Sequence, residues 1–332
     1  MLTDKISTMI SATILVAAMS ASTLGVAKEA FPLKGKTVGV TVIGTDHDWD
    51  LKAYQGQVDE LEALGAEVIA LDAGRNDQTQ VSQIQTLIAQ RPDAIIEQLG
   101  NIDVLDPWMK RVRKAGIPLF TVDTVSAHSI NNTSSNNYNI GANLALQMVT
   151  DMKAKGKVII FNGFASVPVC KIRIDQIKYV FQSFPDIEII SPELRDVIPN
   201  TVQQAYSDMT DMLTKYGPDS GLKSVVACWD VPMIGATQAI EAAKRKGIRT
   251  YGVDGSPEFI EMVANPDSAA GAVVAQQPYE IGRQAARTVA AYLNGKEVPS
   301  FTMVPAVLIN KLNADVTAEK FLKAKKEQES AQ

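Results

Sequence analysis

Short runs of apolar and β-branched residues alternate with amphipathic helical segments from Thr37 onward. This alternation is typical of a parallel sheet with helices packed on both faces. For the first half of the chain we expect strands at residues 37–43, 67–71, 94–96 and 119–122, and helices at residues 53–64, 78–89 and 104–114. These elements complete one doubly wound α/β unit.

The pattern restarts after a polar stretch at residues 129–138 and a predicted helix at residues 140–153. The strands that we expect in the second half lie at residues 158–161, 187–190, 224–228, 249–253 and 271–274. A helix at 279–293 and a strand-like segment at 303–308 remain after this second unit is complete. A chain of 332 residues exceeds the usual size of one core, so we predict an α/β fold with two doubly wound parallel-sheet domains.

The two domains would be joined by a hinge in which the chain crosses three times, near residues 135–137, 276–278 and 304–306. The N-terminal lobe then comprises residues 36–135 with 278–304, and the C-terminal lobe comprises residues 138–275 with 306–317. Residues 318–332 are charged and poor in apolar positions at their end, which predicts a frayed surface helix. The carboxyl ends of the parallel strands face one cleft in this topology, and open α/β sheets bind ligands there.

The first 27 residues have the pattern of a cleavable secretory signal. Lys5 precedes an apolar run at residues 9–21, and the small residues Gly25 and Ala27 follow the run. The run is shorter than the ~20 residues of a membrane-spanning helix. We therefore expect cleavage near Ala27, export to the periplasm and no membrane insertion after cleavage. Because Asp4 beside Lys5 weakens the basic start of the segment, an uncleaved membrane anchor stays open as an alternative.

Composition and charge narrow the possible partners. The formal net charge is −5, which argues against nucleic acid or an anionic membrane surface. Two cysteines and two histidines are too few for zinc sites built from several such ligands. Cys170 follows the first strand of the second half and Cys228 ends its third, and these strands are neighbours in a flavodoxin-like order. A disulfide and two free, partly buried thiols both stay open.

Several carboxylates near His47 could suggest a divalent metal site or a general acid and base pair, but neither signal is specific. Asp72, Asn76 and Asp77 resemble part of a calcium loop, but the glycine at its sixth position and its closing glutamate are missing. The chain has no Gly-x-Ser-x-Gly nucleophile motif and no glycine-rich phosphate loop after a strand. We therefore expect no enzymatic activity, no cofactor and no bound metal.

The loops that follow the predicted strands are unusually polar and would line the cleft. The loop after the first strand contains His47, Asp48, Trp49 and Asp50, which combine an aromatic face with hydrogen-bonding groups. A sugar or polyol suits this combination, because its C–H face packs on a ring while its hydroxyl groups need donors and acceptors. Two alternatives stay open: Asp48 or Asp50 caps the following helix, and Trp49 packs between the domains.

Further candidates follow the other strands, and we select Gln98, Asp123, Arg173, Trp229 and Asp230. An ionised carboxylate roughly doubles the strength of a hydrogen bond from a hydroxyl, and arginine supplies several donors in fixed geometry. These residues predict a binding site for a compound with vicinal hydroxyl groups. Alternatively, Arg173 bridges Asp123 or Asp230 and closes the domains without a ligand.

A resemblance to a known family extends over nearly all of the chain after the predicted signal. Four sequence strings occur in the order found in that family: DAII at 93–96, AGIP at 115–118, YGVDG at 251–255 and AQQPYEIG at 275–282. With them the chain resembles the ribose/galactose-type periplasmic binding proteins, the type I solute-binding components of bacterial sugar ABC importers. The resemblance implies two doubly wound lobes, a hinge and a ligand in the cleft.

The same resemblance implies roles for particular residues. His47 and Trp49 stand where the family has an Asn-x-aromatic cluster, although the asparagine is absent. The other implied ligand contacts are Asp123, Arg173, Asp230 and the hinge residue Gln276, with Ser135 and Asp211 aligned less securely. Many ribose-type members have arginine where this chain has Thr124, so ribose itself is not implied. Trp49 and Trp229 could stack a sugar ring from both sides, and a linear polyol also fits.

We therefore expect the periplasmic substrate-binding component of an ABC importer, which captures a monosaccharide or related polyol by hinge closure. Its partners would be this small molecule and a permease in the inner membrane, and the protein would be a monomer. The alternative is an exported sensor that presents its closed form to a membrane sensor kinase or chemoreceptor. From the strand-end positions, Arg173→Ala or Asp230→Ala is expected to abolish ligand binding and leave the fold intact.

Overall fold

Two six-stranded sheets organise the part of the chain that the computed structural model describes, residues 31–330. The predicted signal at residues 1–27 lies outside the described residues. Among the residues described, no helix combines the length and the apolar character needed to cross a membrane.

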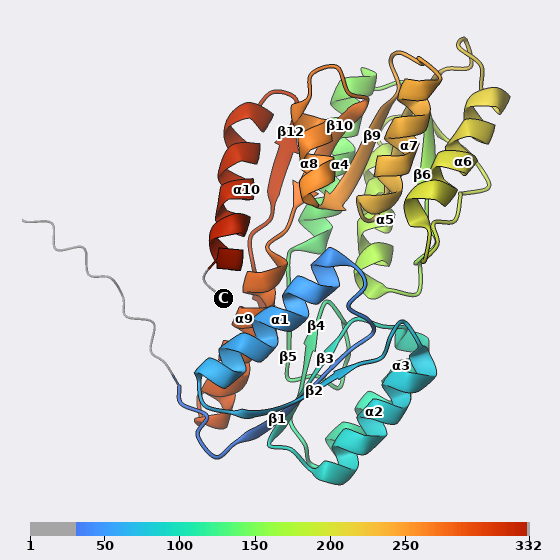
Figure 1. Cartoon of the computed structure of the whole chain (residues 1–332). Helices are drawn as coiled ribbons and strands as arrows, with labels where there is room; N and C mark the ends of the chain where they lie inside the picture. The colour runs from blue at the N-terminus through green and yellow to red at the C-terminus, as the bar shows by residue number, and fades with distance from the viewer. Residues whose placement is uncertain (1–30, 331–332) are drawn as a thin grey trace, which may run out of the picture. The chain divides into compact units, whose positions relative to one another are not determined.

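The first sheet has the strand order β11-β5-β4-β3-β1-β2, and all of its strands are parallel. Its strands are β1 (Thr37–Val42), β2 (Glu67–Asp72), β3 (Ala94–Gln98), β4 (Leu119–Val122), β5 (Asn131–Ser134) and β11 (Phe301–Met303). The central strands are buried because helices cover both faces. Helices α1 (Asp48–Ala63) and α9 (Pro278–Leu293) pack together on one face, and α2 (Asp77–Gln90) and α3 (Ile102–Lys114) on the other (Figure 1).

The second sheet has the order β12-β10-β9-β8-β6-β7, and only β12 runs antiparallel, against β10. Its strands are β6 (Gly156–Phe161), β7 (Ile187–Ile189), β8 (Leu222–Ala227), β9 (Arg249–Asp254), β10 (Ala270–Ala275) and β12 (Val307–Asn310). Its helices are α4 (Asn137–Met152), α5 (Pro168–Phe181), α6 (Thr201–Lys215), α7 (Val231–Ala242), α8 (Pro257–Ala264) and α10 (Ala314–Ser330). The predicted fold class, two doubly wound α/β units, is confirmed.

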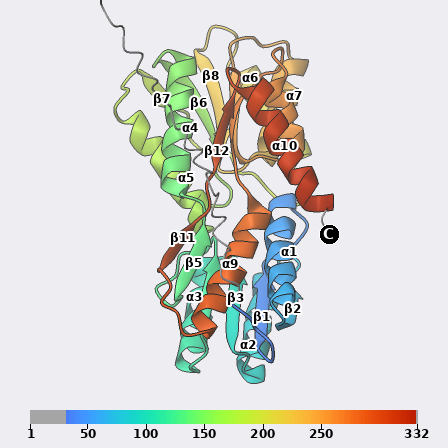
Figure 2. The ribbon, with the colours of Figure 1, turned by 90° about the vertical axis from the view of Figure 1, so that its left-hand side faces the viewer.

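The chain passes between the two sheets at three places, which follow β5, β10 and β11. Figure 2 shows the last of these, where the chain runs from β11 of the first sheet to β12 of the second. The strand-like segment predicted at 303–308 is therefore two short strands in different sheets, and the chain crosses between them at 304–306, where a crossing was predicted. Apolar pattern alone does not separate them, because the break at 304–306 is itself apolar.

Strand β5 lies inside the stretch that its polarity marks as a loop. All four of its residues are buried, because their side chains bond to neighbouring strands instead of to water. Asn131 Nδ2 donates to Pro299 O and Thr302 Oγ1, both at 2.8 Å, and Thr121 Oγ1 donates to Asn132 Oδ1 at 3.2 Å. Tertiary hydrogen bonds thus make a polar segment a core strand.

The final helix begins earlier than the frayed helix expected at 318–332. Helix α10 starts at Ala314, and Ala314 and Ala318 are buried in the second core. The helix packs beside α8 (Figure 1).

Glu97 on β3 is a charged residue type in the middle of the first sheet. It is fully buried, Gln80 Nε2 donates to its Oε1 at 3.3 Å, and its Oε2 has no hydrogen-bond partner. Burial raises the pKa of Glu97 well above its usual value, although hydrogen bonds with Thr124 and Gln80 oppose the shift.

Glu97→Gln is expected to raise the melting temperature above neutral pH, by roughly 2 °C or more. Because the folded-state pKa of Glu97 is raised, folding takes up a proton above the unfolded pKa, and stability falls as pH rises toward the folded value. Melting curves of both proteins from pH 5 to 8 measure this difference. Glu62→Gln provides the control, since it makes the same substitution at an exposed position. Equal pH profiles for wild type and Glu97→Gln would contradict the prediction.

Candidate ligand-binding site

A cavity of about 340 Å³ lies where loops from the two sheets meet. This volume is at the small end of the ~300–1,000 Å³ typical of ligand sites. Elements of the first sheet contribute His47, Trp49, Asp50 and Asp123, and those of the second contribute Phe164, Arg173, Trp229 and Asp254. The cavity therefore combines aromatic walls with a set of charged groups.

Arg173 on α5 is the centre of the polar network, and its side chain is 3% exposed. Its Nε donates to Asn137 Oδ1 (2.6 Å), its Nη1 to Cys228 O (2.9 Å) and Asp254 Oδ1 (3.2 Å), and its Nη2 to Gln276 Oε1 (2.9 Å). Its Nη2 also lies 3.8 Å from Asp123 Oδ2 at the end of β4. Arg173 thus lines the cavity and bridges the two sheets, so the predicted contact with Asp123 is present.

Two carboxylates that face Arg173 have left-handed backbone conformations, with φ of 55° at Asp123 and 94° at Asp254. Such conformations are costly outside glycine and concentrate at functional sites. Burial raises the pKa of Asp123 to about 6, against the opposing effects of Arg173 and a 2.5 Å hydrogen bond from Ser134. Burial likewise raises the pKa of Asp254, and Arg173 opposes this shift.

Asp230 is a fully buried carboxylate with one unused oxygen. Its Oδ2 accepts a 2.6 Å hydrogen bond from the Ser256 N–H, and its Oδ1 has no partner. Burial and then the nearby charge of Asp254 raise the pKa of Asp230 to about 6. The unused oxygen can accept a hydrogen bond from a ligand hydroxyl.

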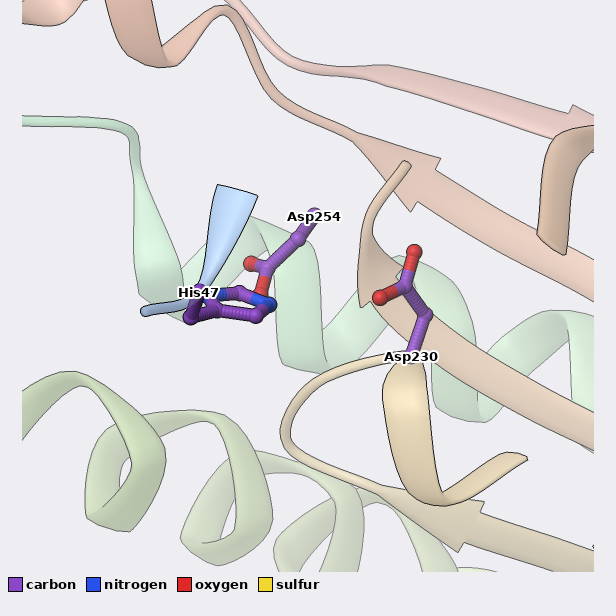
Figure 3. Close-up of side chains that lie close together, drawn as sticks. All are labelled: His47, Asp230 and Asp254. Atoms are coloured by element: carbon purple, nitrogen blue, oxygen red, sulfur yellow. The ribbon is translucent and has the colours of Figure 1, made fainter. Parts of the chain in front are cut away.

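His47 faces these carboxylates from the start of α1 (Figure 3). Its Nδ1 lies 3.9 Å from Asp50 Oδ2. Burial alone would lower the pKa of His47, but the interaction with Asp50 and the charges of Asp254 and Asp230 outweigh burial and raise the pKa. A protonated imidazole donates hydrogen bonds from both nitrogens.

His47, Asp230 and Asp254 also raise the question of a metal site, because one potential ligand atom from each lies within 4.8 Å of the others. Within residues 31–323, whose side chains are described, this is the one such group of three or more. Metal binding requires a neutral histidine, whereas these surroundings favour the charged form. The same three side chains can also hydrogen-bond to ligand hydroxyl groups.

Two tryptophans form apolar walls of the cavity. Trp229 makes edge-on ring contacts with His47 at 5.1 Å and with Phe164 at 5.6 Å between centroids. Trp49 is 5% exposed, and its Nε1 has no hydrogen-bond partner. Trp49 belongs to the same buried apolar cluster as Val169 of α5 and also lines the cavity, so packing between domains and ligand stacking both stay open.

Some buried side-chain N and O atoms of the described residues have no hydrogen-bond partner, both near the cavity and away from it. Four of them belong to predicted site residues: Trp49 Nε1, Ser135 Oγ, Asp230 Oδ1 and Gln276 Nε2. Buried polar groups in proteins are nearly always hydrogen-bonded, so such a group of exceptions indicates partners that a ligand or water supplies.

Six predicted contacts are not among the residues that line the cavity: Asp48, Gln98, Ser135, Asp211, Asp230 and Gln276. Asp230 and Gln276 lie next to residues that do line it, because Asp230 is close to His47 and Asp254 and Gln276 accepts a hydrogen bond from Arg173.

Gln98 contacts a residue that lines the cavity, since its Nε2 donates to Asp50 O at 2.9 Å. Asp48 is exposed, and neither it nor Asp50 is the N-cap of α1, because His47 occupies that position. Asp211 is exposed on α6 and does not line the cavity, so its prediction is corrected. The buried face of α6 carries Met209, Met212 and Leu213, which turns position 211 to solvent.

Several residues that line the cavity were not predicted from the sequence, among them Asp254, Phe164 and Arg75. Asp254 is the last residue of β9 and belongs to the string YGVDG at 251–255. Asp123 was selected because it directly follows a strand, and the same criterion would have selected Asp254. Arg75 follows β2, donates to Asp46 Oδ1 at 2.6 Å and pairs with Asp50. Only the folded chain brings this arginine to Asp50, 25 residues away.

A disulfide joins Cys170 on α5 to Cys228 directly after β8, with an S–S distance of 2.07 Å. Of the two states that the sequence leaves open, the structure contains the bonded one. Because Arg173 donates to Cys228 O, the disulfide links the two segments that position this arginine.

Comparisons with known proteins identify the family. Residues 38–297 match the family model described as periplasmic binding protein domain.

The structure of an ABC sugar transporter subunit from Rhodobacter sphaeroides 2.4.1 has 70% sequence identity and a TM-score of 0.84, and the match covers 85% of this chain and 100% of that one. An ABC transporter solute-binding protein from Agrobacterium vitis, solved with bound allitol, has 52% identity and a TM-score of 0.85, with coverage of 87% and 99%. The xylitol-binding protein of Mycolicibacterium smegmatis is 26% identical over 292 residues, which are 86% of this chain and 80% of that protein. The chain belongs to the periplasmic binding protein family.

Proposed function

We propose that the protein is the substrate-binding component of an ABC importer and captures a monosaccharide or acyclic polyol in the cavity between the two sheets. The observation that carries this proposal is a cavity with tryptophan walls that is also lined by the charged side chains of Arg173, Asp123 and Asp254. The 70% identical sugar transporter subunit supports the importer assignment.

The chemistry of the cavity favours a ligand with several hydroxyl groups. Asp230 and Asp254 accept hydrogen bonds from hydroxyls, whereas Arg173 and His47 donate them. Trp49 and Trp229 pack against the C–H faces of the carbon chain. Allitol in the Agrobacterium vitis protein and xylitol in the name of the Mycolicibacterium smegmatis protein make acyclic polyols the first ligands to test.

Binding proceeds by closure of two lobes around the ligand. The N-terminal lobe comprises residues 36–135 with 278–304 and the C-terminal lobe residues 138–275 with 306–317, and the three crossings between the sheets form the hinge. A ligand that contacts both lobes stabilises the closed form. A shift from mostly open to mostly closed needs a preference of about 5 kcal/mol, which two or three charge-assisted hydrogen bonds and ring packing can supply.

Export places this clamp beside its transporter. The protein is secreted through the signal that ends near Ala27 and acts as a monomer in the periplasm. An inner-membrane permease recognises the closed form and accepts the ligand. The protein catalyses no reaction and carries no cofactor.

Ligand-free protein is expected to melt at a higher temperature with allitol or a related polyol than without it. Ligand at ~100 times its Kd stabilises the folded state by about 2.7 kcal/mol. We would measure melting temperatures with allitol, xylitol, ribose and hexoses, and then Kd by calorimetry for each compound that raises them. L-Leucine, which has no vicinal hydroxyl groups, is the negative control. If no sugar or polyol shifts the transition of protein refolded free of ligand, the proposed ligand class is wrong.

A further inference from the structure

Asp196 is a buried carboxylate outside the cavity, in the loop between β7 and α6. This loop runs alongside the end of β6. Leu194 N donates to Ile160 O at 2.9 Å, and Asn162 N donates to Leu194 O at 2.8 Å. Asp196, 5% exposed, therefore has a fixed backbone position beside the loop that begins at Asn162.

Both carboxylate oxygens of Asp196 accept hydrogen bonds from uncharged N–H groups. Oδ1 accepts from the backbone N–H of Gly163, and Oδ2 accepts from the indole Nε1–H of Trp229. The two loops approach so closely that a Cβ on Gly163 would lie 2.0 Å from Asp196 O. Asp196 thus joins its own loop to the loops after β6 and β8.

Trp229 is the group through which this contact reaches the cavity. Its ring contacts Phe164 on one side and His47 on another, and all three residues line the cavity. These apolar contacts allow a planar ring to pivot, whereas a hydrogen bond from Nε1 to a fixed carboxylate oxygen defines the orientation of the ring.

We propose that Asp196 is a positioning residue for ligand recognition, which orients the Trp229 indole against the carbon chain of the ligand. The inference rests on the proposed function for the identity of the ligand, but the orientation of the indole does not depend on it.

The test compares Asp196→Ala and Asp196→Asn with the wild type. Asparagine has nearly the same shape but one carbonyl oxygen, so it cannot accept both hydrogen bonds. We expect allitol affinity to fall about 10-fold or more in Asp196→Ala, with an intermediate loss in Asp196→Asn. In ligand-free protein, the NMR resonance of the Trp229 Nε1–H, assigned with Trp229→Phe, should move upfield and exchange faster with water in Asp196→Ala.

A double-mutant cycle separates positioning from a general effect on the loop. In the Trp229→Phe background, which lacks the indole N–H, Asp196→Ala should change allitol affinity less than about 3-fold. Glu193→Gln is the control, because Glu193 lies in the same loop and binds Asn162 and Lys178 but does not contact Trp229. It should leave both the indole resonance and the affinity unchanged.

The possible results decide the two proposals separately. An unchanged indole resonance in Asp196→Ala, or the same loss of affinity with and without the indole, would overturn the positioning role. A wild type that binds no polyol would refute the proposed ligand class, and the indole resonance would still decide whether Asp196 orients Trp229.

Discussion

Arg173→Ala is expected to weaken ligand binding at least 100-fold and to lower the free energy of unfolding by about 3–5 kcal/mol. The guanidinium is buried and neutralises Asp254 and Asp123, so its removal leaves two buried carboxylates without their cation. The substitution also removes the hydrogen bonds that Arg173 donates to Gln276 and Asn137. Both residues lie where the chain passes from one sheet to the other. From the sequence position of Arg173 we expect the variant to keep its fold. The contacts of Arg173 in the structure predict that the variant loses stability as well as ligand affinity.

Calorimetry with the ligand found for the wild type and urea denaturation of ligand-free protein measure the two effects. Arg287→Ala is the matched control, because Arg287 pairs with Glu60 and Glu280 on α1 and α9 and does not line the cavity. It should leave ligand affinity unchanged. An Arg173→Ala protein with affinity within 3-fold of the wild type would remove the proposed site.

Asp230→Asn is expected to stabilise the ligand-free protein and to weaken ligand binding at least 10-fold. The pKa of Asp230 is raised to about 6 in the folded state, from about 3.9 when unfolded. Folding therefore takes up a proton between these values, and stability falls as pH rises through this window. A neutral amide avoids this cost, which is about 1–3 kcal/mol above pH 6. The same substitution removes the charged acceptor that Oδ1 offers to a ligand.

Melting temperatures from pH 4 to 8 test the sign of this effect, and calorimetry tests the affinity. The difference between Asp230→Asn and wild type should grow from pH 4 to 6 and then stay constant. Asp93→Asn provides a control of opposite sign: burial raises the pKa of Asp93, but hydrogen bonds from Lys36 and Thr37 outweigh burial and lower it, so the substitution should destabilise the protein at neutral pH. Lower stability of Asp230→Asn at pH 7 would show that its carboxylate stabilises the fold.

The raised pKa values of three buried carboxylates indicate that the site is built for binding at some expense of stability. Asp230, Asp254 and Asp123 crowd negative charge into a buried space that one arginine and one histidine only partly neutralise. Loss of stability at functional sites is common where activity needs groups that a core would exclude. Ligand hydroxyls supply the missing donors.

The alternation of strands and helices can be predicted from the sequence. Each central strand of a parallel sheet is buried on both faces, so it forms a short apolar run in the sequence. The sequence also locates part of the cavity lining, since a residue such as Asp123 or Trp229 directly after a strand must lie at the carboxyl edge of its sheet. Both inferences need only local pattern and one topological rule.

Which of these side chains contact one another depends on the tertiary structure and does not follow from the sequence pattern. Polar β5 is a core strand because of partners up to 171 residues away, and Arg75 reaches Asp50 only when the loops after β1 and β2 come together. The orientation of Trp229 depends on Asp196, which has no signature in the sequence. Hydrogen bonds between distant segments depend on distances and angles, and hydrophobic periodicity records neither, so the sequence locates the edge of each sheet but not the contacts made across it.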